Sequence, residues 1–311
     1  MTHHTLFKQK IIIIVGPTAV GKTRTAIDLA LTFSGEIINA DAMQIYRRMN
    51  IGSAKPTFEE TTQIPHHGID IIDPDEPFDA ARFEQSARHD IDALLQRGVL
   101  PFVVGGTGLY IRALLYGLCD AISASPELRA NLQAEADQKG TAALYDRLST
   151  VDPESAAKIH PNDKIRIIRA LEVFLLTGTR LSRHHQAHQF KQSAFDFLKI
   201  GLHLDRETLY DRINRRTDAM ISAGLEAEVR SLLASGYASS LNAMQSIGYR
   251  HVVDFLEGRL DWQEAVRTMK RDTRRYAKRQ MTWFMKEPDI CWKRPDEIAA
   301  MRDLIRAFIH Q

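Results

Sequence analysis

The sequence predicts an α/β protein whose core is a parallel sheet like that of the phosphate-loop NTPases, with a helical insertion and a helical C-terminal part. Three observations support this prediction. An apolar run at residues 11–15 leads directly into a glycine-containing turn at residues 16–23. Strand-like and helix-like stretches then alternate as far as residue 104. Beyond residue 121, apolar residues recur mainly at helical spacing.

The first part of the chain reads as alternating strands and helices. Asp79 is placed to cap the start of one helix, and Arg97-Gly98 is typical of its end. The predicted elements are a strand at 11–15, a helix from about 22, a strand at 36–40, an extended stretch at 67–72, a helix at 78–96 and a strand at 99–104.

Residues 121–192 lack strand signals, and we predict that they form a helical insertion domain. Residues 1–120 and 193–311 then make up a discontinuous α/β core. The polar, His-rich stretch 183–189 predicts a loop that returns to this core. Residues 195–204 predict a further core strand, and the remainder is expected to be mostly helical.

The composition is that of an ordinary globular protein, with 311 residues, 44% hydrophobic residues and a formal net charge of +2. No apolar stretch approaches the roughly 20 residues that span a bilayer, so we expect a cytoplasmic protein without a membrane partner. We also expect a monomer. The small net charge does not by itself indicate nucleic-acid binding, which must be argued from where the charges lie.

The turn after the first predicted strand is a full match to the phosphate-binding loop. Its backbone N–H groups and the following helix dipole favour an anion. Lys22 is placed to reach a terminal phosphate, and the Thr23 hydroxyl to bind a Mg²⁺ cofactor. The residues of the match are Gly16, Pro17, Thr18, Ala19, Val20, Gly21, Lys22 and Thr23.

Two further predicted strands end in residues suited to chemistry. Asp41 follows the second strand, so its carboxylate is expected to face the phosphate loop at the same sheet edge. It is suited to hold Mg²⁺, to accept a proton, or only to cap a helix, and the residue alone does not separate these roles. The turn at 105–110 contains three glycines and places Thr107 on the same edge.

A basic helix is predicted near the C-terminus. Its basic residues recur at three- and four-residue spacing, with Asp272 as their acidic neighbour and apolar residues such as Met269 and Tyr276 opposite. We favour contact with RNA or DNA over a solvated face. The basic residues are Arg267, Lys270, Arg271, Arg274, Arg275, Lys278 and Arg279.

Taken together, these motifs closely resemble those of the bacterial tRNA dimethylallyltransferase family. The matching segments cover nearly the whole chain: 16–23, 39–46, 51–56, 105–110, 169–173, 224–229 and 246–250. The resemblance implies transfer of a dimethylallyl group from dimethylallyl diphosphate to N6 of the adenosine at tRNA position 37, next to the anticodon. It also implies that diphosphate is released and that the insertion closes over the anticodon stem-loop.

The resemblance further implies roles for individual residues. Asp41 would deprotonate the attacking amine beside Thr107, while Lys22 and Arg216 would bind the leaving diphosphate. The residues implied in tRNA binding are Asp41, Ala42, Met43, Gln44, Thr107, Arg129, Ile165, Arg166, Ile167, Ile168, Arg169, Ser246, Ile247, Gly248, Tyr249, Arg250 and His251.

Two alternatives remain open at this point. An ATP-dependent small-molecule kinase would use the same loop, with an aspartate to activate an alcohol. A non-catalytic RNA-binding module would use the loop only to sense a nucleotide. The basic helix argues against the kinase, and the combination of Lys22, Asp41 and Thr107 argues against the module.

Overall fold

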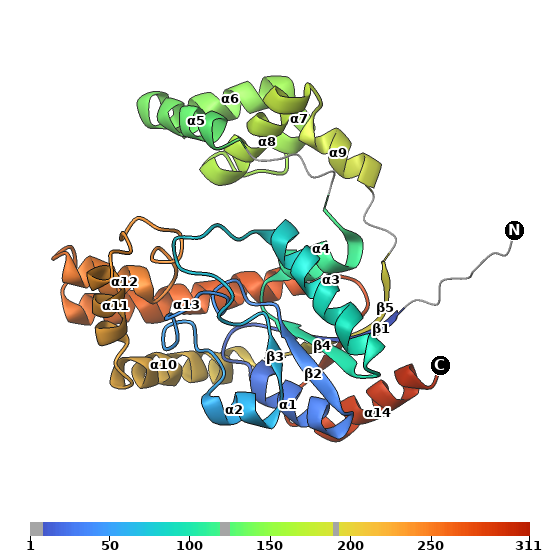
Figure 1. Ribbon diagram of the computed structural model, residues 1–311. Coiled ribbons are helices and arrows are strands. Elements are labelled where there is room, and N and C mark those ends of the chain that lie inside the picture. Colours follow the sequence, from blue (N-terminus) through green and yellow to red (C-terminus); the bar gives the residue numbers. More distant parts are fainter. Residues whose placement is uncertain (1–8, 119–124, 189–192) are drawn as a thin grey trace, which may run out of the picture. The chain divides into compact units, whose positions relative to one another are not determined.

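The computed structural model describes residues 9–118, 125–188 and 193–311. Within them, six strands form one parallel sheet in the order β3-β2-β4-β1-β5-β6 (Figure 1). The apolar residues 11–15 lie in the middle of this sheet and are fully buried, as expected for a strand covered on both faces. The predicted fold class is confirmed. The strands are β1 (Gln9–Val15), β2 (Gly35–Asn39), β3 (His66–His67), β4 (Leu100–Gly105), β5 (Phe195–Leu202) and β6 (Ile290–Lys293).

Helices cover both faces of the sheet (Figure 1). On one face, α1 (Lys22–Thr32), α10 (Arg206–Ser222) and α14 (Ile298–Ile309) bury apolar residues against Ile12, Ile14 and Phe102. On the other face lie α3 (Ala80–Gln96) and α4 (Gly108–Tyr116). Asp79 caps α3 by accepting hydrogen bonds from the N–H groups of Ala81 and Arg82, as predicted. The short α2 (Phe58–Gln63) precedes β3.

The C-terminal helices build a second apolar cluster beside the sheet. The elements are α11 (Leu225–Ala234), α12 (Tyr249–Leu256) and the long α13 (Trp262–Phe284). They pack around Tyr249, Val252 and Met269, together with Ile45 and Met49 from the segment that follows β2. This cluster anchors that segment next to the carboxyl edge of the sheet.

The chain divides into two compact units, Met1–Leu115 with Ala194–Gln311 and Tyr116–Ser193. The second unit has its own core, which includes Leu144, Leu148, Ile167 and Leu171. Because this core is self-contained, the unit buries its apolar faces within itself. Its helices are α5 (Pro126–Lys139), α6 (Thr141–Val151), α7 (Pro153–Ala156), α8 (Lys164–Thr177) and α9 (Leu181–His188).

Three local predictions were wrong or incomplete. Residues 181–188 form helix α9 instead of a loop, because the buried carboxylate of Asp152 accepts a hydrogen bond from the N–H of Ser182 and fixes the start of the helix; Gln189 lies outside the described residues. Of the extended stretch predicted at 67–72, only His67 lies in a strand, which begins at His66, and Ile72 adds an isolated bridge to Tyr46. Strand β6 was missed because it is four residues long and half-buried.

Candidate active site

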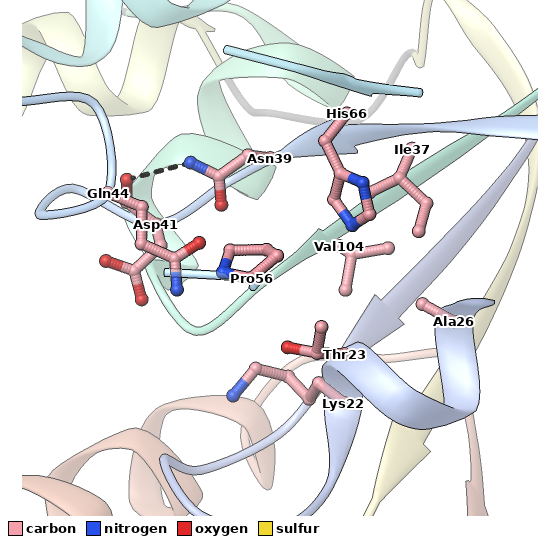
Figure 2. A pocket seen from close by; sticks show the side chains of 11 residues that line it. Lys22, Thr23, Ala26, Ile37, Asn39, Asp41, Gln44, Pro56, His66 and Val104 are labelled. Carbon is pink, nitrogen blue, oxygen red and sulfur yellow. Dashed lines mark hydrogen bonds between the residues drawn. The ribbon is translucent and has the colours of Figure 1, made fainter. Parts of the chain in front are cut away.

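Three loops meet at the carboxyl edge of the sheet because β1, β4 and β2 are neighbours in it. Parallel strands end at the same edge, so the segments that follow them lie side by side. Together they line a cleft that contains Lys22, Thr23, Asp41 and Gln44 and is also lined by Pro56 (Figure 2). Residues as far apart in the sequence as Thr18 and Arg216 thus line one site. This strand order places the loops that carry Lys22, Asp41 and Thr107 at one edge of the sheet, as expected from the sequence.

The loop after β1 presents free backbone N–H groups to the cleft. Gly21 is the N-cap of α1 and has a φ of 112°, in the left-handed region that favours glycine. It supplies no side chain to cap the helix, so the first N–H groups of α1 remain available to an anion. Gly16 is required for another reason, since a Cβ there would lie 2.7 Å from the carbonyl oxygen of Leu202.

Lys22 is folded against its own loop. Its ammonium group donates to the carbonyl oxygens of Gly16 at 3.0 Å and Pro17 at 2.9 Å. Burial lowers the pKa of Lys22 to about 8, with a smaller contribution from the positive charge of Arg216 and an opposing one from Asp41. An ammonium group whose pKa is lowered by desolvation gains strongly from an anionic ligand, because the ligand replaces lost solvation.

Two arginines of α10 also face this loop. Arg216 donates to the Thr18 hydroxyl at 3.3 Å, and Arg212 donates to the carbonyl oxygen of Val20 at 3.1 Å. Burial lowers the pKa of Arg216, and Asp41 opposes that shift. The neighbouring Arg215 is exposed and pairs with Asp211 instead. All three arginines line the cleft, and among them Arg216 is the one that donates to a side chain of the loop.

Asp41 and Thr107 are connected through the backbone. The Asp41 Oδ1 atom accepts the N–H of Met43 at 2.8 Å, in a turn and not at the start of a helix, which removes the helix-cap alternative. The Thr107 hydroxyl accepts the N–H of Ala42 at 3.1 Å. Each side chain is thus fixed by one main-chain bond, while the second Asp41 oxygen and the Thr107 proton stay available to a substrate.

The glycines after β4 are explained by close packing. A Cβ on Gly105 would lie 2.0 Å from the carbonyl oxygen of Ala40, and one on Gly106 would lie 2.2 Å from Nε2 of Gln280. Gly108 is equally close to the indole ring of Trp283. The sequence analysis did not identify Gln280 or Trp283 as site residues. The sequence signal that could have identified Gln280 is its position, since it is a polar residue on the apolar face of α13, four residues after Tyr276.

The segment 50–56, which forms one wall of the cleft through Ala54 and Pro56, is held by a carboxylate that the sequence analysis also missed. Glu228 of α11 accepts N–H bonds from Asn50, Ile51 and Gly52 at 2.8–3.1 Å. The segment that it holds accepts a hydrogen bond of 3.0 Å from the Gln44 amide at the carbonyl oxygen of Ala54. The wall is therefore rigid, and the orientation of the Gln44 side chain is set by it.

The cleft also contains a donor set suited to a hard cation. Thr23, Asn39, Asp41 and Gln44 place hydroxyl, amide and carboxylate groups around one pocket (Figure 2). Oxygen ligands are those preferred by Mg²⁺, which usually binds through one or two protein groups together with substrate phosphates. The residues present therefore fit the predicted cofactor, with Thr23 as its expected ligand.

The residues implied in tRNA binding fall into three places. Asp41 to Gln44 and Thr107 line or adjoin the cleft. Arg129, Ile165, Arg166 and Arg169 lie on the second unit, where Ile165 is 82% exposed. Ser246 to His251 lie at the start of α12. Five of the set are buried, and four of them, Ile167, Ile168, Tyr249 and His251, have side chains that pack against neighbouring residues instead of forming a surface; the fifth is Gly248.

The basic face of α13 is more neutralised than the sequence indicated. Asp272 pairs with Arg271 and Arg275, as expected from the sequence. Glu264 also pairs with Arg267, and Asp218 of α10 pairs with Lys270. Within the described part of the chain, Lys278 and Arg279 are the basic residues of this face without a carboxylate or amide partner. The unneutralised part of the face is thus its C-terminal end.

The described residues contain no helix long and apolar enough to cross a bilayer.

Comparison with known families identifies this arrangement. The model of the IPP transferase family matches residues 44–287, and the model of the isopentenyl transferase family matches residues 9–67. The chain belongs to the IPP transferase family. The family predicted from the motifs is therefore confirmed.

Relatives within the IPP transferase family extend over almost the whole chain. A tRNA dimethylallyltransferase of Desulfosudis oleivorans is 54% identical over 92% of this chain and 91% of its own length. The solved tRNA isopentenylpyrophosphate transferase of Bacillus halodurans is 42% identical, with a TM-score of 0.74 and 97% of each chain covered. A eukaryotic dimethylallyltransferase solved while acting on tRNA is 31% identical, with a TM-score of 0.77 over 91% of this chain and 73% of that one. These similarities favour a prenyltransferase over both alternatives.

Proposed function

We propose that this protein is a tRNA dimethylallyltransferase. It transfers the dimethylallyl group of dimethylallyl diphosphate to N6 of adenosine 37, next to the anticodon, and releases diphosphate. The observation that carries this proposal is the meeting of three loops at one sheet edge, where a phosphate-binding loop faces the carboxylate of Asp41 and the adjoining Ala42 donates its N–H to the Thr107 hydroxyl.

The donor side of the reaction belongs to the loop after β1. The diphosphate occupies the N–H groups at the start of α1, and Lys22 exchanges its two carbonyl partners for phosphate oxygens. Arg216 approaches from α10. Charge accumulates on the leaving diphosphate as the bond between C1 and oxygen breaks, so these cations stabilise the transition state more than the ground state. Thr23 would hold a Mg²⁺ ion in the cleft, and the ion would neutralise part of the same charge.

The acceptor side belongs to Asp41. The N6 amine attacks C1 of the dimethylallyl group, a C–N bond forms, and the C1–O bond breaks with its electron pair leaving on the diphosphate. The amine then loses one proton, which passes to the Asp41 carboxylate. The Met43 N–H holds the carboxylate in place, so its orientation does not depend on the substrate.

The RNA is held through residues of both units. Adenosine 37 must leave its stack to reach a cleft, which costs a few kcal/mol that contacts elsewhere must offset. In the second unit, Arg129 and Arg169 are held by the buried Glu172 carboxylate at 2.8 and 2.6 Å and so present ordered guanidinium groups. Arg250 of α12 is held in the same way by Asp272 at 2.6 Å.

The test of this function is a choice between two labels. The protein is incubated with bulk tRNA and either dimethylallyl diphosphate labelled in its carbon chain or ATP labelled at the γ-phosphate. We expect the carbon label to enter RNA and, after nuclease digestion, to appear as N6-dimethylallyladenosine. Entry of the phosphate label, or of neither label, would contradict the proposal. A tRNA with guanosine at position 37 is the matched control and should stay unlabelled.

A further inference from the structure

One side chain connects the phosphate loop to the loop that carries Thr107. Gln280 of α13 is only 5% exposed. Its Oε1 accepts the N–H of Thr18 at 2.9 Å, and its Nε2 donates to the carbonyl oxygen of Gly106 at 2.9 Å. Since one partner only donates and the other only accepts, the amide orientation is fixed by its surroundings. Gln280 therefore spans the two loops with both ends engaged.

Each end of this bridge touches a residue next to the chemistry. Thr18 also accepts a hydrogen bond from Arg216 through its hydroxyl, so it is held from two sides. Gly106 immediately precedes Thr107, whose N–H donates to the carbonyl oxygen of Ala40 at 3.2 Å. A continuous set of contacts thus runs from the donor loop, through Gln280, to the segment that carries Asp41.

We propose that Gln280 is a positioning residue that fixes the separation between the diphosphate loop and the loops that hold the acceptor amine. The proposal rests on the function proposed above. A helix places a side chain more rigidly than a loop does, and α13 is the longest helix of the core. The Gln280 amide occupies the space that a Cβ of residue 106 would need, so the contact requires a glycine at this position.

This role predicts a loss of rate and not of binding. Reacting atoms must be held close to their final geometry, and a displacement of about 1 Å can cost a factor of about 100. Neither loop loses its own ligand-binding groups when Gln280 changes. We therefore expect the rate of the bound complex to fall while tRNA affinity is retained.

The experiment is a double-mutant cycle read by single-turnover transfer at saturating donor and tRNA. Gln280→Met keeps the length of the side chain and removes both bonds. Gly106→Ala keeps Gln280 but forces its amide away, because the new Cβ would lie 2.2 Å from Nε2. Each variant should lower the rate roughly 10- to 100-fold, with the tRNA dissociation constant within about threefold of wild type. The double variant should be no more than about threefold slower than the slower single variant.

Thr268→Val is the matched control on α13. Thr268 is a buried polar residue whose hydroxyl bonds only to carbonyl oxygens of its own helix. It should transfer within about twofold of the wild-type rate. Gln280→Glu should lie between wild type and Gln280→Met, because it still accepts the Thr18 N–H but cannot donate to Gly106. The proposal would be overturned if the losses of the two single variants multiplied in the double variant. It would also be overturned if a higher donor concentration restored the rate of the variants, or if Thr268→Val lost as much rate as they do.

A second readout separates this proposal from the proposed function. Adding Mg²⁺ and inorganic diphosphate should slow backbone amide exchange in residues 100–110 of the wild type, and this effect should vanish in Gln280→Met and Gly106→Ala. If the wild type transfers no label to tRNA, the proposed function is wrong and the exchange result still decides the bridge. Protection that persists in both variants would show that Gln280 does not connect the loops.

Discussion

The cleft and the second unit use charged residues in opposite ways. In the cleft, Lys22 and Asp41 are held by backbone groups and face a space that a substrate must fill. In the second unit, the carboxylates of Glu172 and Asp152 are fully buried and satisfied within the unit itself. The charged groups of the cleft are therefore left for a ligand to pair with, whereas the buried carboxylates of the second unit are already paired within it. Changes in the cleft should affect chemistry, and changes in the second unit should affect stability and RNA affinity.

The largest expected effect comes from the acceptor side of the cleft. Asp41→Asn keeps an oxygen for the Met43 N–H but removes the group that accepts the proton. We expect turnover to fall about 10²- to 10⁴-fold, the usual range for losing a general base, with tRNA binding retained. Asp75→Asn, an exposed carboxylate in the same unit, is the control and should be neutral. Near-normal turnover of Asp41→Asn would mean that another group takes the proton.

The donor side of the cleft should depend on pH through Lys22. Its pKa is about 8, so in the free protein the side chain loses its charge as the pH rises through that value. Binding of diphosphate requires the charged form, and affinity should therefore fall about tenfold between pH 8 and pH 9.5. Lys22→Arg does not titrate in this range and corrects for ionisation of the ligand itself. Titration calorimetry with Mg²⁺-diphosphate measures the affinity of the wild type and of Lys22→Arg at each pH. If the two affinities changed in parallel with pH, a titrating Lys22 would be ruled out.

The sequence predicted the residues of the cleft that belong to local motifs far better than the residues that hold those motifs in place. The phosphate loop and Asp41 were found because a local pattern follows a buried strand, and topology then places them at one edge. Gln280 and Glu228 were missed because their partners lie 174–262 and 176–178 positions away. A polar residue on the apolar face of a helix indicates only that some partner exists. Residues 183–188 were mispredicted as a loop because a distant buried carboxylate, Asp152, and not local composition, fixes where α9 starts.

A smaller effect is expected from the buried carboxylate of the second unit. Burial alone would raise the pKa of Glu172, but hydrogen bonds from Arg169, the Ser125 N–H and Arg129 outweigh it and hold the pKa below its ordinary value. Because the folded-state pKa is depressed, this stabilisation is present at neutral pH and is lost as the pH falls below about 4.5. Glu172→Gln should cost about 2 kcal/mol of stability in denaturant titrations at pH 7 and much less at pH 3.

The same substitution sharpens the comparison between the units. Glu172→Gln should release Arg169 and weaken tRNA binding about 5- to 10-fold, while the single-turnover rate at saturating tRNA changes less than about threefold. Glu154→Gln is the control, since Glu154 is an exposed carboxylate of the same unit paired with Lys158. A loss of rate at saturation would show that the second unit also takes part in chemistry.

The smallest effect should come from the exposed C-terminal end of α13, where the Arg279 guanidinium lies over the ring of Tyr276. Lys278 and Arg279 are exposed, and neither forms an ion pair among the described residues. Phosphate contacts release counterions, so each one adds to the slope of log affinity against log salt. Reversing both residues to Glu should weaken tRNA binding about 3- to 10-fold at low salt and flatten that slope, with the rate of bound RNA unchanged. The control reverses Arg259 and Arg306, which have acidic partners and give the same change in net charge. If both pairs flatten the slope equally, the effect is one of net charge alone, and the RNA footprint lies on Arg129, Arg169 and Arg250 instead.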